Sequence, residues 1–200
     1  NFTSLTIGKN IINTKNTKVQ SMNVGKYKML QCLGEGAFAK VYKAYNEDTN
    51  EMFAIKMFKS ENRGKKFNEL VLREILLLKR LKHENIVELK EMCYENLYPK
   101  ESDCYAGNLF FVLELCDKTL EDVISEESNT LTLNDRISIM NQCLRGVDYM
   151  HRNNCFHRDL KPENLLVMQR KDGRLTIKLT DFGLAMHVTG PIKTVCGTPT

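Results

Sequence analysis

The pattern of apolar and polar residues changes several times along this chain of 200 residues. Residues 1–23 alternate Asn, Thr and Lys with isolated aliphatic residues and show no helical period, which predicts a flexible arm, with one added strand as the alternative. From Tyr27 onward, the segments YKMLQCLGEG, AKVYKAYN and MFAIKMF are typical of strands and are separated by turn residues such as EDTN. This part of the pattern predicts three successive antiparallel strands.

A helical period follows in the segment FNELVLREILLLKRL. Its apolar residues fall at positions 67, 70, 71, 75, 78 and 81, the spacing of an amphipathic helix. The segments NIVELKEMCY and NLFFVLEL then predict two more strands, which the polar insertion ENLYPKESDCYAG joins. The first half of the chain is therefore predicted to be a five-stranded sheet with one main helix.

Helical spacing dominates after Glu114. The segment LNDRISIMNQCLRGVDYMHRN has apolar positions at 137, 140, 144, 147 and 150–151, and Asn134 is its predicted N-cap. Short strands return at Leu165–Val167 and Leu175–Leu179, separated by the turn RKDGR. A sheet-rich half thus meets a helical half, and we expect a crevice between them near residues 114–118.

Composition excludes several classes of protein. Hydrophobic residues make up 42% of the chain and the net charge is only +4, with basic and acidic residues interspersed, so we expect neither nucleic-acid nor membrane binding. No apolar run approaches the roughly 18 residues of a membrane span, and the first residues lack the apolar core of a signal peptide. The seven cysteines are scattered and odd in number, which predicts reduced thiols in a cytoplasmic or nuclear protein.

The segment LGEGAFAKV places Gly34 and Gly36 between two predicted strands. Glycines let a hairpin backbone approach phosphates closely and offer its N–H groups to them. Taken alone, however, such a pair is more often a simple turn. A Rossmann-type fingerprint is excluded because these glycines do not open a helix.

Lys56 closes the segment FAIK on the next predicted strand. A lysine within an apolar strand is costly unless its charge has partners. Glu74 on the predicted helix is one candidate partner, and phosphate oxygens are another. The alternative is a lysine at a strand end that reaches out to water.

Two further motifs decide between these interpretations. The segment HRDLKPENLL crowds His157, Arg158, Asp159, Lys161 and Asn164 into eight residues, as a site for a phosphate, a metal ion and a hydroxyl proton requires. The tripeptide DFG at 181–183 follows a predicted strand, where a carboxylate can hold Mg²⁺ together with phosphate oxygens. With the glycine hairpin, the strand lysine and the helix glutamate, five motifs occur in the order of one signature.

These motifs identify the chain, from about Tyr27 to its last residue, as similar to the eukaryotic protein kinases, and the lysine of HRDLKPEN resembles the serine/threonine kinases. The resemblance implies an α+β, bilobal fold with an antiparallel five-stranded N-lobe, one main helix and a helical C-lobe. It divides the chain into an arm at 1–23, the N-lobe and hinge at 24–116, and the first part of the C-lobe at 117–200. The C-lobe is incomplete, because the chain stops before an Ala-Pro-Glu motif.

The resemblance also assigns roles, with ATP and Mg²⁺ as the implied cofactors. Catalytic roles fall to Lys56 with Glu74, to Asp159 as acceptor of the substrate hydroxyl proton, and to Lys161 beside the γ-phosphoryl group. Asn164 and Asp181 are the implied metal ligands. His157 is expected to pack against Phe182. The ATP-binding positions, with Leu113 as gatekeeper and a hinge at 114–116, are Leu33, Gly34, Glu35, Gly36, Ala37, Phe38, Ala39, Lys40, Val41, Ala54, Lys56, Leu113, Glu114, Cys116, Leu166 and Asp181.

Regulation and substrate choice follow from the same resemblance. Thr194 stands where related kinases carry an activating phosphothreonine, and Arg158 is the implied receptor of that phosphate. Thr198 and Glu163 are the implied substrate-binding residues. Because Glu163 is the residue type that meets a substrate arginine, we expect protein substrates that are basic around the phosphoacceptor.

The motifs place the chain, by resemblance, in the calcium/calmodulin-dependent group of the family, although one segment resembles another group. The segments PENLLV, KLTDFGLA and TVCGTPT most resemble the calcium/calmodulin-dependent group and, within it, the doublecortin-like kinases. The segment LREILLLKRLKHENIVELKE is closer to cyclin-dependent-kinase-like sequences. The chain also has His83-Glu84-Asn85 where His-Pro-Asn is usual.

Two other functions compete with a protein kinase. A pseudokinase scaffold binds nucleotide or partners without catalysis, but such proteins usually lose the equivalents of Lys56, Asp159 or Asp181, which this chain retains. A small-molecule kinase of similar fold lacks the CGTPT ending of the activation segment.

Overall fold

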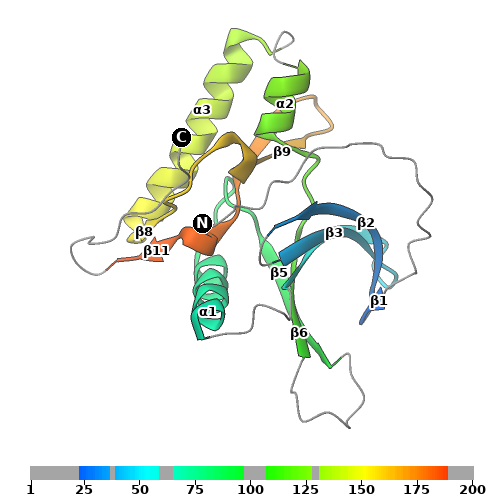
Figure 1. Ribbon diagram of the computed structural model, residues 1–200. Coiled ribbons are helices and arrows are strands. Elements are labelled where there is room, and N and C mark those ends of the chain that lie inside the picture. Colours follow the sequence, from blue (N-terminus) through cyan, green and yellow to red (C-terminus); the bar gives the residue numbers. More distant parts are fainter. Residues whose placement is uncertain (1–22, 37–38, 59–64, 97–106, 128–130, 189–200) are drawn as a thin grey trace.

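The computed structural model describes residues 23–36, 39–58, 65–96, 107–127 and 131–188, with the side chains of 65–70, 94–96, 107–108 and 127 left aside. Figure 1 shows a curled sheet with one helix beside it and, beyond the segment 115–117 that follows β6, a second part that carries two helices and short strands. The elements are β1 (Asn23–Val24), β2 (Tyr27–Glu35), β3 (Ala39–Asn46), β4 (Glu51–Phe58), α1 (Lys65–Arg80), β5 (Leu89–Asn96), β6 (Gly107–Glu114), β7 (Lys118–Thr119), α2 (Leu120–Glu127), α3 (Leu133–Arg152), β8 (Cys155–Phe156), the 3₁₀ helix η2 (Pro162–Asn164), β9 (Leu165–Gln169), β10 (Leu175–Leu179), the 3₁₀ helix η3 (Phe182–Leu184) and β11 (Met186–His187).

The large sheet has six strands, in the antiparallel order β1-β2-β3-β4-β6-β5. The sequence predicted five strands, with one added strand in the arm at 1–23 as an alternative, and β1, which begins at Asn23, is the sixth. Asn23 and Val24 pair with Lys28 and Tyr27 across a turn in which Gly25 has a φ of +54°, a conformation that glycine adopts without strain. The rest of the predicted arm, residues 1–22, lies outside the described residues.

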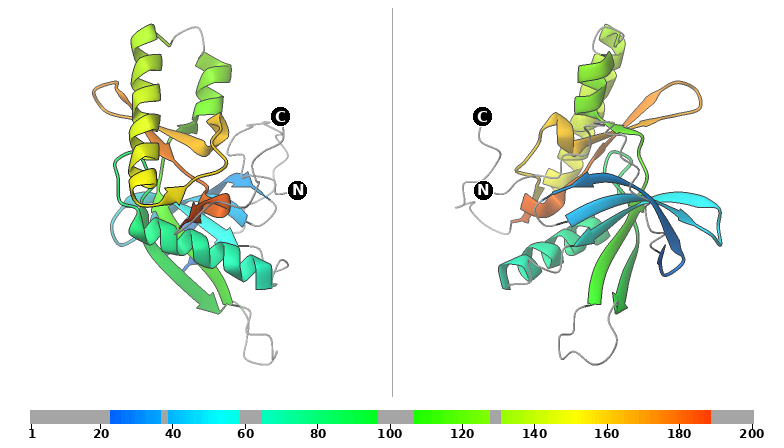
Figure 2. Two further views of the ribbon diagram at one scale, coloured as in Figure 1. Left: turned by 90° about the vertical axis from the view of Figure 1, so that its left-hand side faces the viewer. Right: turned by 45° about the vertical axis from the view of Figure 1, so that its right-hand side comes forward.

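Both faces of the sheet are covered around β6. Phe110 and Val112 pack into a cluster with Ile55 on one face, while Phe111 packs with the helix α1 on the other. All three β6 residues are fully buried, which explains the unbroken apolar run LFFVL in a central strand. Figure 2 shows α1 alongside the sheet, with α2 and α3 side by side in the second part.

The period of α1 places its apolar residues against the sheet as predicted. Val71, Ile75 and Leu78 are buried, whereas Leu72 and Leu76 on the outer face are 57% and 67% exposed. Positions 67 and 70 of the predicted stripe lie outside the described side chains.

The prediction for α3 was wrong in two respects. Its N-cap is Thr132 rather than Asn134: the Asp135 N–H donates to Thr132 Oγ1, and the Thr132 N–H donates to Asp135 Oδ2. This reciprocal pair satisfies two backbone donors at once, which favours it over a single cap at Asn134. Of the predicted apolar positions, Ile137, Met140 and Leu144 are exposed and Met150 is buried; the buried residues of the helix are Ile139, Gln142, Gly146 and Met150.

The strand predicted from Asn85 begins four residues later, at Leu89. The preceding residues leave the large sheet and pair with β10 instead. The Leu179 N–H donates to Asn85 O at 2.9 Å, the Val87 N–H donates to Leu179 O at 2.9 Å, and Ile86 forms a parallel bridge with Leu179. This short ladder joins the two parts of the molecule behind the crevice.

Across the described residues, no helix has the length and apolar character needed to cross a membrane.

Candidate active site

A cavity lies between the two parts of the molecule, beside the segment 114–118 that connects them. Its predicted lining residues are Leu33, Val41, Ala54, Lys56, Glu74, Leu113, Glu114, Cys116, Leu166 and Asp181. Apolar side chains from β2, β3, β4 and β9 form its walls, while charged groups gather at its inner end. A flat aromatic ring with a polar tail fits such an arrangement.

The glycine hairpin reaches this cavity through Leu33 and Val41, whereas Gly34, Gly36 and Ala39, predicted to bind ATP, are not among the lining residues. Gly34 pairs with Val41 and Glu35 with Lys40 in the β2–β3 register, and the Gly36 N–H donates to Ala39 O at 2.9 Å. Glu35 and Lys40, predicted to bind ATP, form an exposed ion pair of 3.1 Å with each other and are not among the lining residues. Ala37 and Phe38 lie outside the described residues.

Lys56 lies at the inner end of the cavity, on β4. Its Nζ is 2.6 Å from Glu74 Oε1 on α1 and 3.7 Å from Asp181 Oδ1, and its side chain is only 6% exposed. Burial by itself would lower the pKa of Lys56, but the two carboxylates outweigh it and raise the pKa. The lysine therefore stays charged at neutral pH, and the alternative of a side chain reaching into water is excluded.

Asp159 is held by two neighbours from its own loop. Asn164 Nδ2 donates to Asp159 O at 2.8 Å and to Asp159 Oδ2 at 3.0 Å, and Lys161 Nζ lies 3.4 Å from the same oxygen. Asp159 is 7% exposed and Asn164 is fully buried. The carboxylate thus has a fixed orientation, as a group that takes a proton from a bound hydroxyl needs.

His157 supports this loop from beneath. Its ring lies 5.3 Å from the Phe182 ring, as expected, and its Nε2 is 2.8 Å from Thr180 O. Because the Asp159 N–H donates to Nδ1, the ring proton resides on Nε2 and is donated to the Thr180 carbonyl. Burial lowers the pKa of His157, so the ring is neutral and joins the Asp159 loop to the residue before Asp181.

Asp181 has a left-handed backbone, with φ 59° and ψ 73°. This conformation costs roughly 1–3 kcal/mol in a non-glycine residue. It is held by Phe182, which is fully buried in the cluster that includes α1 residues. The turn brings the Asp181 carboxylate next to Lys56.

Arg158 also has a positive φ, of 67°, and its Nε donates to Leu184 O at 2.8 Å just after the DFG turn. Thr194 and Thr198 lie outside the described residues. The predicted pairing of Arg158 with a phosphate on Thr194 therefore stays a prediction. Glu163 is half-buried in η2, immediately before Asn164.

Comparison with known proteins gives the family. A model of the protein kinase domain matches residues 27–200. The chain belongs to the protein kinase family. The predicted bilobal kinase fold is thereby confirmed, with the sixth strand as its correction.

The relatives place the kinase within a group. It is 41% identical over 165 residues to the cyclin-dependent kinase F-3 of Oryza sativa subsp. japonica, covering 82% of this chain and 34% of that protein. It is 37% identical over 164 residues to the cyclin-dependent kinase 9 of Xenopus tropicalis (81% and 43%), and 38% identical over 162 residues to that of Homo sapiens (81% and 42%). The chain thus spans less than half the length of these relatives. They do not support the predicted calcium/calmodulin-dependent group or, within it, the doublecortin-like kinases, and they agree with the similarity noted for LREILLLKRLKHENIVELKE.

Asn164 and Asp181, of which Asp181 lines the kinase cavity, offer oxygen ligands for a cation. Asn164 Oδ1 is buried and has no hydrogen-bond partner, which is costly for a polar atom unless something else binds it. The described residues contain no group of three or more His, Cys, Asp or Glu side chains able to hold a metal by themselves. Asn164 and Asp181 therefore fit Mg²⁺, which takes one or two protein ligands together with phosphate oxygens.

Several lining residues of the kinase cavity were not predicted, namely Leu78, Val87, Leu115, Asp117, Lys118, Thr180 and Phe182. Leu115 sits between two predicted hinge residues, and Thr180 and Phe182 flank Asp181, so adjacency in sequence could have found them. Val87 carried no such signal, because its place at the cavity depends on the ladder with Leu179. Burial, together with the negative charge of Glu114, raises the pKa of Cys116 to about 12, so this hinge thiol stays protonated.

Proposed function

We propose that this kinase transfers the γ-phosphoryl group of ATP to serine or threonine hydroxyls of protein substrates. The observation that carries the proposal is the fixed Asp159 carboxylate, held by Asn164 and Lys161 in the loop that adjoins Asp181 and Lys56. Lys56 and Asp181 line the cavity, and the retention of Lys56, Asp159 and Asp181 together argues against the pseudokinase alternative. Family membership and the cyclin-dependent kinase relatives support the same activity.

In this mechanism the side chains position the reacting groups and neutralise the negative charge of the phosphates. Lys56, kept charged by Glu74, binds the α- and β-phosphates, and Lys161 binds the transferring group. The substrate hydroxyl oxygen forms a bond to the γ-phosphorus, the bond to the bridging oxygen of ADP breaks, and Asp159 accepts the hydroxyl proton. Mg²⁺, held by Asn164 and Asp181, supplies positive charge at the phosphates.

The test uses the full-length protein with its natural partners, isolated from cells. Transfer of radiolabelled γ-phosphate to a protein substrate is measured for wild type, Asp159→Asn and the control Asp148→Asn. Asp148 is an exposed α3 carboxylate that pairs with Arg152 at 2.8 Å, away from the cavity. We expect Asp159→Asn to lower kcat by orders of magnitude and Asp148→Asn to leave it unchanged. Turnover near the wild-type rate in Asp159→Asn would exclude the proposed mechanism.

A regulatory partner of the cyclin type is proposed for α1. The names of the relatives describe kinases that depend on cyclins. Leu72 and Leu76 form an exposed apolar pair one helical turn apart, and the same helix presents Glu74 to Lys56. A protein that covers these leucines would hold the Lys56–Glu74 pair in place.

The partner proposal is tested by co-precipitation of a panel of cyclins with the full-length kinase. We expect binding to be lost in a Leu72→Asp, Leu76→Asp double variant. Binding should remain in Leu133→Asp, a control at an exposed leucine on α3. Absence of cyclin binding by the wild type, or equal binding by both variants, would contradict this assignment.

The finer points of substrate choice, regulation and location remain proposals of the same function. Glu163 supports a preference for basic residues around the phosphoacceptor, and Thr194 is the proposed activating phosphosite. Cytoplasmic or nuclear residence is proposed from the reduced cysteines. A peptide array on the active protein tests the first point: a strict requirement for proline after the phosphoacceptor, without basic preference, would overturn it.

A further inference from the structure

A second cavity, of about 280 Å³, lies between α3 and the hairpin formed by β9 and β10. Its polar lining comes from α3, from the hairpin and from Glu84, and comprises three arginines (Arg145, Arg170 and Arg174), two carboxylates (Glu84 and Asp135) and the uncharged Ser138, Gln142 and Thr176. Among the described residues, the two cavities share no lining side chain. Nothing in the kinase reaction accounts for three arginines at this place.

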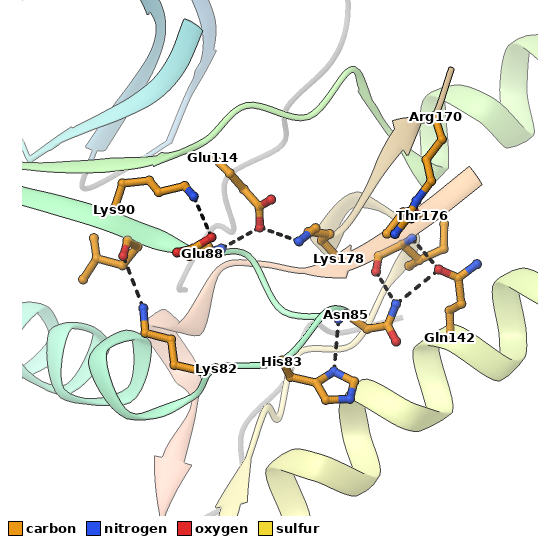
Figure 3. Close-up of polar contacts among 12 residues, drawn as sticks. Lys82, His83, Asn85, Glu88, Lys90, Glu114, Gln142, Arg170, Thr176 and Lys178 are labelled. Carbon is orange, nitrogen blue, oxygen red and sulfur yellow. Dashed lines mark hydrogen bonds and ion pairs between the residues drawn. The ribbon is translucent and has the colours of Figure 1, made fainter. Parts of the chain in front are cut away.

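The floor of this arginine cavity is built from buried polar groups. Gln142, 7% exposed, uses its whole amide: Nε2 donates to Leu175 O at 2.9 Å and to Ser138 Oγ at 3.3 Å, while Oε1 accepts from the Ile177 N–H at 2.9 Å. Thr176, 5% exposed, accepts a hydrogen bond from Arg170 Nε at 2.6 Å (Figure 3). Ser138 and Thr176 thus act as acceptors, which leaves each hydroxyl proton for a ligand.

The charged groups at the rim differ in how firmly they are paired. Arg174 is held by Asp172 at 2.6 Å. Arg145 lies 3.6 Å from Glu84, and both side chains are more than half exposed, so this pair contributes little and is easily exchanged. Within the described part of the chain, Arg170 has no carboxylate within ion-pair distance, 4.0 Å, and its Nε is fixed by Thr176.

The carboxylates at the cavity do not supply enough acceptors for these donors. Asp135, at the edge of the cavity, accepts hydrogen bonds from the Thr132 backbone and hydroxyl at 2.9 and 2.6 Å. The guanidinium groups of Arg145 and Arg170, with two hydroxyl protons, therefore exceed the acceptors left to them. A cavity with surplus donors around a fixed arginine suits a ligand that carries several acceptor oxygens and negative charge.

We propose that the arginine cavity binds the phosphate group of a phosphorylated serine or threonine on a protein partner. Three acceptor oxygens and nearly two negative charges match the surplus of donors. At about 280 Å³ the cavity has room for part of the peptide as well as the phosphate. Its lining contains no aromatic side chain among the described residues, and so offers no surface on which a nucleotide base could stack. The site recruits a partner independently of phosphoryl transfer.

The experiment measures binding by the full-length kinase with its nucleotide site filled by a non-hydrolysable ATP analogue. The probes are a fluorescent peptide pool with a central phosphoserine between degenerate positions, the same pool without phosphate, and inorganic phosphate. We expect binding of the phosphorylated pool alone among the peptides, and a loss of about tenfold in affinity in Arg170→Gln. The control is Arg152→Gln, an exposed arginine at the far end of α3 that does not line the cavity.

Fold and activity are monitored alongside binding. Arg170→Gln should leave the melting temperature and the basal phosphoryl transfer unchanged, because Arg170 is outside the active site. Should it unfold the protein, Arg145→Gln, an exposed side chain, replaces it with an expected loss of several-fold. The proposal is overturned by equal binding of the two pools, by inorganic phosphate binding without phosphopeptide binding, or by undiminished affinity in a folded Arg170→Gln or Arg145→Gln variant. Loss of kinase activity alone would bear on the proposed function and not on this site.

Discussion

Lys178 Nζ lies 2.8 Å from Glu114 Oε1, so that a residue of β10 in the second lobe is paired with the last residue of β6 at the hinge (Figure 3). Each side chain is only 12% exposed. The same Glu114 oxygen accepts the Glu88 N–H at 2.7 Å, and the Glu114 N–H donates to Glu88 O at 3.0 Å. The first hinge residue, which also lines the nucleotide cavity, is therefore fixed from both lobes.

Replacing Lys178 by Met should lower the free energy of unfolding by about 2 kcal/mol, because the largely buried Glu114 carboxylate would lose its positively charged partner. Denaturant unfolding of the full-length kinase measures the change. Lys90→Met is the matched control: Lys90 pairs with Glu88 at 2.7 Å, but both side chains are over 40% exposed, so about 0.5 kcal/mol or less is expected. Equal losses of unfolding free energy in the two variants would show that burial does not strengthen the Lys178–Glu114 pair.

Variants of Lys56 and Glu74 should affect stability and activity differently. Lys56→Met leaves a buried carboxylate and is expected to destabilise the fold by about 3–5 kcal/mol. A Lys56→Met, Glu74→Leu double variant should recover most of that loss, since no unpaired charge remains, while phosphoryl transfer stays at least a hundredfold below wild type. Unfolding curves and initial rates on the same preparations provide both readings. Recovery of activity in the double variant would show that the lysine does not act on phosphates.

His157 should make stability depend on pH in a defined direction. Because burial lowers its pKa in the fold, the unfolded chain binds its proton first as the pH falls below the ordinary value of 6.5. The free energy of unfolding therefore decreases as the pH falls from 6.5 toward the folded-state pKa, and this contribution is constant above that window. In His157→Gln the decrease below pH 6.5 should be smaller than in the wild type. Parallel curves for the two proteins would mean that folding does not shift the pKa of His157.

Asn164→Ala should raise the Mg²⁺ concentration needed for half-maximal phosphoryl transfer at least several-fold, because it removes the unpartnered Oδ1. It also removes the two hydrogen bonds to Asp159, so kcat at saturating Mg²⁺ should fall as well. Magnesium titrations at fixed ATP separate the two effects. A lower kcat with an unchanged magnesium requirement would assign Asn164 a positioning role only.

Gly146→Ala should destabilise the kinase by about 1–3 kcal/mol, although alanine normally stabilises a helix interior by up to about 1 kcal/mol relative to glycine. An added Cβ would lie 2.1 Å from Leu179 Cδ1 and 3.0 Å from Asn85 O. Thermal unfolding gives the sign directly. A raised melting temperature would mean that Leu179 moves aside freely.

Much of the site was predictable because its groups sit at positions that local sequence defines. Lys56 and Glu74 were placed on a strand and on the buried face of a helix, and packing that helix on the sheet brings them together. The error in α3 has a different cause. Periodicity showed that Ile137, Met140 and Leu144 share a face, but not that this face is exposed, since burial depends on what else packs there.

Other features depended on contacts between distant segments. The start of β5 at Leu89 and the place of Val87 at the cavity follow from pairing with Leu179, about ninety positions later in the chain. By contrast, the capping box at Thr132 and Asp135 is present in the sequence as Thr-x-x-Asp, whereas the prediction of Asn134 rested on the preference of a single residue type.

The ladder between Asn85, Val87 and Leu179 has a consequence for how the chain opens. A backbone hydrogen bond exchanges its proton only when the segments on both sides of it separate. The amides of Val87 and Leu179 belong to different lobes, yet neither N–H can be exposed to solvent unless the two segments separate at this ladder. The two lobes should therefore unfold as one cooperative unit at this seam, with equal hydrogen-exchange protection for these two amides.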